Sequence, residues 1–64
     1  MFVQAGRRYR HKKTRGTYRV VCTATLEADR ATVMVVYVNE KNQTPWVRPL
    51  TEFMDGRFVE IEES

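Results

Sequence analysis

The chain is poor in the residues that build disulfide frameworks and metal sites, because it has one cysteine, Cys22, and one histidine, His11. Small secreted domains usually stabilise a thin core with several disulfide bonds, so an intrachain disulfide framework is excluded. Two such residues are also too few for a four-ligand metal site unless carboxylates or a second chain contribute. We therefore expect neither a metal nor a cofactor. Cys22 lies in an alternating apolar run, which favours a small buried side chain over a reactive thiol.

Long apolar runs are also lacking. The longest, residues 33–38, is far shorter than the roughly 20 residues of a membrane-spanning helix. Residues 1–6 lack the apolar stretch of a signal peptide, and the arginines follow this segment instead of preceding it. We expect a cytoplasmic protein without a membrane partner, folded as a single domain over residues 1–64.

Acidic residues are missing from the first 20 positions, which carry a charge of +7, whereas residues 21–64 carry four cations and eight acids, a charge of −4. Cations surrounding an aromatic residue, Tyr9, are typical of a surface that contacts phosphates and stacks bases. The alternative is an edge strand whose charges prevent aggregation or neutralise an acidic neighbour. The candidate nucleic-acid-binding residues are Arg7, Arg8, Arg10, Lys12, Lys13 and Arg15.

The remaining sequence alternates as β-strands do. From Tyr18 to Leu26 every second residue is apolar or small, which predicts a strand with Cys22 on the same face as Val20. Residues 32–38 are β-branched and apolar on both faces, which predicts a central strand covered on both sides. Further strands are expected at residues 9–12, 44–48 and 58–61, with turns at 27–31 and 39–43.

Pro49 should end its strand, and Leu50, Phe53 and Met54 follow it at helical spacing. This pattern predicts a single turn of 3₁₀ helix before the last strand. Four to five short strands with such a turn are the layout of a small SH3-like β-barrel, a mostly β fold. The alternative is a three-stranded meander that completes its core by dimerising, so the protein is expected to be a monomer or a homodimer.

Four short motifs occur in a fixed order and are followed by Phe53: Tyr9-Arg10-His11, Tyr18-Arg19-Val20, Val35-Val36-Tyr37 and Trp46-Val47-Arg48-Pro49-Leu50. In this order they resemble the short bacterial and phage proteins of the family called domain of unknown function 1653, and the resemblance spans residues 6–61. The chain departs from the family at residues 12–17, where members usually have a Tyr-Lys-Gly-type turn. It departs again at 24–31, where members often carry a His-Ser-x-Thr-like segment. The resemblance implies an SH3-like fold and a bacterial or phage origin, and it implies no established activity.

Trp46 and Arg48 are two apart on a predicted strand, so their side chains share a face. A tryptophan face attracts cations, and arginine binds carboxylate or phosphate with two hydrogen bonds. The alternative is that Trp46 anchors the core and Arg48 stacks on it or pairs with Glu52. Trp46 and Arg48 are the centre of the predicted ligand-binding groove.

Tyr9, Arg10 and His11 lie on the first predicted strand, which an SH3-like closure brings to the last, so they would form the opposite lip of the groove. Whether Tyr37 joins depends on the turn at 39–43. A five-residue loop pairs Val36 with Trp46, whereas a four-residue loop pairs Val35 with Trp46 and puts Tyr37 on the Trp46 side.

Catalysis has little support in the sequence. His11 cannot be placed beside Cys22 or a carboxylate, and the three glycines are isolated, so no glycine-rich phosphate loop exists. We expect a small non-enzymatic binding module whose groove takes an anionic or aromatic group or a protein partner. One alternative is a nucleic-acid-binding protein that uses the basic N-terminal third. The other is a phage-type interaction or inhibitor factor that docks through a sheet edge.

Overall fold

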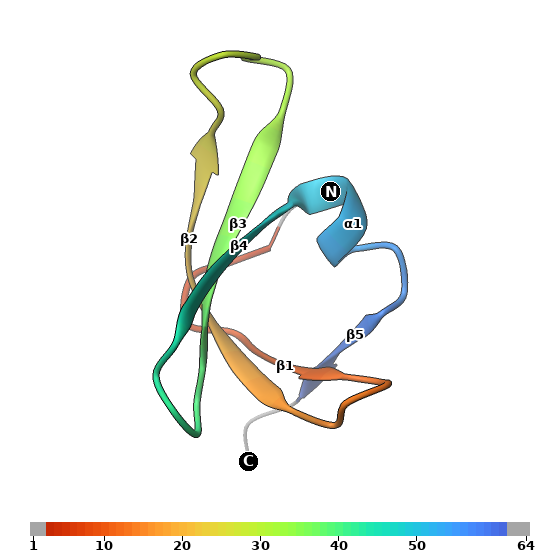
Figure 1. The fold of residues 1–64 in the computed structure, drawn as a ribbon. Helices are drawn as coiled ribbons and strands as arrows, with labels where there is room; N and C mark the ends of the chain where they lie inside the picture. Colours follow the sequence, from red (N-terminus) through yellow and green to blue (C-terminus); the bar gives the residue numbers. More distant parts are fainter. Residues whose placement is uncertain (1–2, 62–64) are drawn as a thin grey trace.

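The computed structural model describes residues 3–61, which form one five-stranded antiparallel sheet and one helical turn (Figure 1). The elements are β1 (Arg8–His11), β2 (Thr17–Thr25), β3 (Val33–Asn39), β4 (Pro45–Pro49), α1 (Leu50–Phe53) and β5 (Phe58–Ile61). The strand order is β4-β3-β2-β1-β5. The mostly β prediction is confirmed. The sheet is open, because the outermost strands β4 and β5 are not paired with each other in the described part of the chain. No helix within residues 3–61 is long and apolar enough to cross a membrane.

β2 changes face at a bulge. Its register with β3 shifts between Val20, which pairs with Tyr37, and Cys22, which pairs with Val36. The extra residue, Val21, reverses the direction of every side chain beyond it. Val20 is therefore buried, while Cys22 is exposed. The prediction that Cys22 is a buried side chain on the Val20 face is wrong for this reason.

β3 has its buried residues on one face only. Val35 and Tyr37 are buried and face the core, while Val36 and Val38 on the other face are half-buried. The prediction of a strand covered on both sides is therefore wrong for the outer face. The reason is that the helical turn α1 covers a single face, where its Phe53 packs against the core.

The segment after β4 forms one turn of α-helix, and the prediction of a 3₁₀ turn is corrected. The Met54 backbone N–H donates to the Leu50 carbonyl at 2.9 Å, an i to i+4 bond. Pro49 precedes the turn with φ −56°, which proline favours. The turn buries Phe53 completely, with its ring stacked on that of Phe58 at a centroid distance of 4.4 Å. The buried core consists of Val3, Tyr9, Val20, Val35, Tyr37, Phe53 and Phe58.

The turn between β3 and β4 sets the register of Trp46. Asn39 closes it, because its backbone N–H donates to Thr44 and its side-chain oxygen accepts the N–H groups of Lys41 and Asn42. Gln43 adopts a left-handed conformation with φ +63°. With this turn, Tyr37 of β3 pairs directly with Trp46 of β4. Neither pairing considered from the sequence occurs, but Tyr37 does lie on the Trp46 side.

Candidate functional site

One face of the sheet carries a hollow of about 240 Å³, to which every strand contributes a side chain. We call it the aromatic groove; it is lined by His11, Thr14, Tyr18, Tyr37, Trp46, Arg48 and Phe58. Cross-strand pairing brings these residues together, since His11 pairs with Phe58 and Tyr37 pairs with Trp46. Directly paired residues of antiparallel strands point to the same face. The groove therefore follows from the sheet register.

Trp46 forms an exposed wall of the aromatic groove. Its exposed fraction is 52%, whereas Tyr37 directly opposite has 4%. A tryptophan that anchors a core would bury most of its surface. Trp46 therefore does not anchor the core, and Phe53 and Phe58 fill that role instead.

Arg48 is held beside the wall by three neighbours. Its Nε donates to the Tyr37 hydroxyl at 3.3 Å, and its Nη1 lies 3.4 Å from Oε1 of Glu52. The guanidinium carbon lies 5.9 Å from the centre of the Phe58 ring, within the range of a cation–π contact. The hydrogen bond with Tyr37 raises the pKa of Arg48 above its ordinary value. Arg48 is therefore a fixed positive charge in the groove.

His11 supplies a polar edge. Its Nδ1 accepts backbone N–H groups from Lys13 at 3.2 Å and Thr14 at 3.3 Å. The ring packs edge-on against Phe58, with centroids 4.9 Å apart. Because Nδ1 is an acceptor, the hydrogen-bond network assigns the proton of the neutral ring to Nε2. Nε2 is thus the donor that the ring offers.

Three groove residues were missed from the sequence: Thr14, Tyr18 and Phe58. The Tyr18 ring packs edge-on against Tyr37 at 5.5 Å and Phe58 at 5.8 Å. The alternation that puts Val20 in the core also places Tyr18 on the core face, so this signal was present. Phe58 gives no comparable signal, because its place opposite His11 depends on pairing between residues far apart in the chain.

The predicted lip of Tyr9, Arg10 and His11 is divided in the structure, and only His11 lies in the aromatic groove. Tyr9 shares the His11 face, but it is buried under Phe53, with ring centroids 4.9 Å apart. Burial, together with the charge of Glu60, raises the pKa of Tyr9. Arg10 points to the other face, because consecutive strand residues alternate. The prediction that Tyr9 and Arg10 line this groove is wrong.

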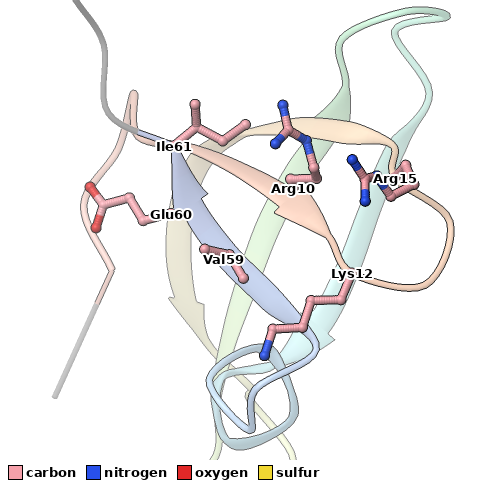
Figure 2. A pocket seen from close by; sticks show the side chains of 6 residues that line it. All are labelled: Arg10, Lys12, Arg15, Val59, Glu60 and Ile61. Carbon is pink, nitrogen blue, oxygen red and sulfur yellow. The ribbon is translucent and has the colours of Figure 1, made fainter.

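The basic N-terminal residues divide into paired and unpaired cations. Arg8 donates two 2.8 Å hydrogen bonds to the Glu40 carboxylate, and Arg7 lies 3.5 Å from Glu60. Four others have no ion pair with any residue from 3 to 61: Arg10, Lys12, Lys13 and Arg15. Three of these four line a second hollow, of about 470 Å³, shown in Figure 2.

In the part of the chain that the structure describes, no three side chains of His, Cys, Asp or Glu gather as metal ligands would. The comparisons with known proteins found no curated protein and no solved structure that matches the chain. The sequence model of the family described as "Protein of unknown function (DUF1653)" matches residues 7–64, nearly the whole length, and the chain therefore belongs to this family.

Proposed function

We propose that this protein is a small, non-enzymatic binding module that holds its ligand in the aromatic groove. The observation that carries the proposal is the half-exposed Trp46 beside a positioned Arg48. The exposed apolar surface of an indole is costly to leave in water. Next to a fixed cation, it offers a ligand both apolar area and charge. Tyr18, Tyr37 and Phe58 form the floor beneath them.

The groove favours a planar or apolar group that carries an adjoining anion. The planar group would lie against Trp46, and the anion would accept hydrogen bonds from Arg48. Because Tyr37 and Phe58 already hold Arg48, binding costs little of its rotamer entropy. Glu52 competes for the guanidinium, but their contact is exposed and such pairs are weak.

The size of the groove limits what enters it. Pockets that enclose a whole drug-sized molecule measure about 300–1,000 Å³, and the groove measures about 240 Å³. It therefore suits one side chain or one ring of a larger ligand, such as a protein partner. Docking of a partner strand on β4 has less support, because Pro45 and Pro49 at its two ends have no N–H to donate.

The arrangement around the groove supports an SH3-like fold, which we include in the proposal. The first strand lies between the second and the last, and a helical turn precedes the last strand. The bulge at Val21 bends the long β2 strand, as a barrel corner requires. A cytoplasmic location in a bacterial or phage setting fits an exposed free thiol, which persists most readily in a reducing compartment.

The test is a nuclear magnetic resonance titration with phenyl phosphate and benzoate, with benzyl alcohol as the matched neutral probe. We expect the two anions, at about 10 mM, to shift the Trp46 indole and Arg48 Nε–H signals, because fragments bind weakly. Trp46→Ala should stay folded and abolish the shift of the Arg48 Nε–H signal. Arg48→Gln should remove the preference for anions over benzyl alcohol. Shifts confined to residues outside the groove would contradict the proposal.

A further inference from the structure

A second hollow lies on the opposite face of the β1–β5 ladder from the aromatic groove. We call it the basic pocket; it is lined by Arg10, Lys12, Arg15, Val59, Glu60 and Ile61 (Figure 2). Arg10 pairs with Val59 across the ladder, whereas the adjacent pair of His11 with Phe58 lines the aromatic groove. Because adjacent pairs point to opposite faces, the two hollows are separate sites.

The rim of the basic pocket carries three cations. Arg10, Lys12 and Arg15 have no ion pair with any residue from 3 to 61. The one acid of the lining, Glu60, lies 3.5 Å from Arg7, and Figure 2 shows it directed away from the three cations. Three like charges around one hollow repel one another, so an anion that enters it is attracted by all three.

Arg15 occupies its place at a conformational cost. Its φ is +66°, in the left-handed region that arginine rarely adopts. The turn imposes this conformation, because the Arg15 N–H donates to the His11 carbonyl at 2.8 Å and the His11 N–H donates to Gly16 at 2.9 Å. The turn thus places the side chain of Arg15 at the pocket, as part of the same lining as Arg10.

The floor of the basic pocket is apolar. Val59 has an exposed fraction of 46%, and Ile61 beside it is partly exposed. A ligand that satisfied only the cations would leave this floor in water. The ligand that fits both parts carries repeated negative charges and also flat or apolar groups that are free to be buried.

We infer that the basic pocket binds single-stranded nucleic acid, with phosphates on Arg10, Lys12 and Arg15 and a base or sugar on Val59 and Ile61. A duplex offers the same phosphates but keeps its base faces stacked inside, so it cannot cover the floor. The pocket, at about 470 Å³, also has room for about one nucleotide. Tyr9 takes no part in base stacking, because it is buried on the other side of β1.

The test measures fluorescence anisotropy of a labelled oligothymidylate and of a duplex of equal length, each at about 50 and about 200 mM salt. We expect several-fold tighter binding of the single strand. The double variant Lys12→Gln/Arg15→Gln should weaken single-strand binding at least tenfold. It should also reduce the slope of log affinity against log salt concentration by roughly 1.4, since each single-strand phosphate contact contributes about 0.7. Arg30→Gln/Lys41→Gln removes the same charge from two remote turns and should leave the slope unchanged.

Two further variants separate this pocket from the aromatic groove. Val59→Ser should weaken single-strand binding and leave the salt slope unchanged, because it removes floor and not charge. Trp46→Ala should leave the oligonucleotide affinity unchanged, although it abolishes binding in the groove. Four outcomes overturn the inference: equal affinity for strand and duplex, no binding tighter than about 100 µM at low salt, loss of binding in Trp46→Ala, or stronger competition by polyglutamate than by unlabelled oligothymidylate. The first, second and fourth outcomes leave the binding of aromatic anions in the groove untouched, whereas the third, in a folded Trp46→Ala variant, would move the oligonucleotide to the groove.

Discussion

Arg8 in β1 and Glu40 in the turn after β3 form a two-pronged ion pair, in which Nε and Nη2 each lie 2.8 Å from a carboxylate oxygen. Arg19 in β2 approaches the same carboxylate at 3.5 Å. The Arg8 and Glu40 side chains are 31% and 21% exposed, so water screens the pair only in part. Glu40 therefore joins three segments of the sheet and engages two of the N-terminal cations, Arg8 and Arg19.

Glu40→Gln should lower the free energy of unfolding by about 1–2 kcal/mol at about pH 7, since hydrogen bonds to charged partners are worth that much. The hydrogen bonds from Arg8 lower the pKa of Glu40 below 4.5 in the folded state. The stabilisation is thus present above about pH 4.5 and is lost as the pH falls through the folded value. Urea unfolding of both proteins at about pH 7 and about pH 3 measures the difference, which should be smaller in acid.

Glu52→Gln is the control for this prediction. Glu52 also contacts an arginine, but it is 52% exposed and makes a single contact at 3.4 Å. Its removal should change stability by less than about 0.5 kcal/mol at either pH. A Glu40→Gln effect that persists undiminished in acid would show that the side chain acts through packing and not through its charge.

Phe53→Ala and Trp46→Ala should have opposite consequences for the fold. Phe53 is fully buried between Phe58 and Tyr9, so its truncation should cost about 3–5 kcal/mol and unfold so small a domain. Trp46 is half exposed, and its truncation should cost no more than about 1 kcal/mol. Thermal unfolding followed by circular dichroism distinguishes the two. Unfolding of Trp46→Ala would place Trp46 in the core after all.

Cys22 should react with a thiol reagent in the native state as readily as in urea, because the bulge at Val21 turns it outwards. We expect one equivalent of Ellman's reagent to be consumed at a rate within about tenfold of the unfolded rate. Cys22→Ser should change stability by less than about 0.5 kcal/mol, as surface substitutions do. Reaction that waits for unfolding would support the interpretation of Cys22 as a core residue.

The same bulge shows where prediction from this sequence ends. Alternation from residue 18 and the β-branched run before Val38 were sufficient to predict strands there, and Pro49 marked the end of β4. The bulge left no signal, because Val20, Val21 and Cys22 are all apolar and any of them could have been the extra residue. The predicted assignment of β2 side chains to the two faces of the sheet is therefore correct up to Val20 and reversed after it.

The candidate site divides in the same way between local and long-range information. Trp46 and Arg48 share a face because they are two apart on one strand, which needs no knowledge of the fold. Arg10 was assigned to the wrong face even though alternation alone separates it from His11. The pairing of Arg8 with Glu40 was beyond reach, because the two residues are 32 positions apart. Which cations remain unpaired is therefore a property of the tertiary structure.

Tyr9 should ionise later than an ordinary tyrosine, and two neighbouring variants should move its pKa in opposite directions. Burial raises this pKa most, Glu60 raises it further, and Arg7 lowers it. Glu60→Gln should therefore bring the Tyr9 step down, while Arg7→Gln should raise it. Ultraviolet absorbance of the tyrosinate form, with Tyr9→Phe to identify the step, measures both. The folded pKa of Tyr9 lies above the unfolded value of 10.0. The contribution of neutral Tyr9 to the free energy of unfolding is therefore complete below about pH 10, and it is lost as the pH rises through the folded pKa. If Tyr9→Phe removes the earliest tyrosine step and not the latest, Tyr9 is not buried under Phe53 in solution.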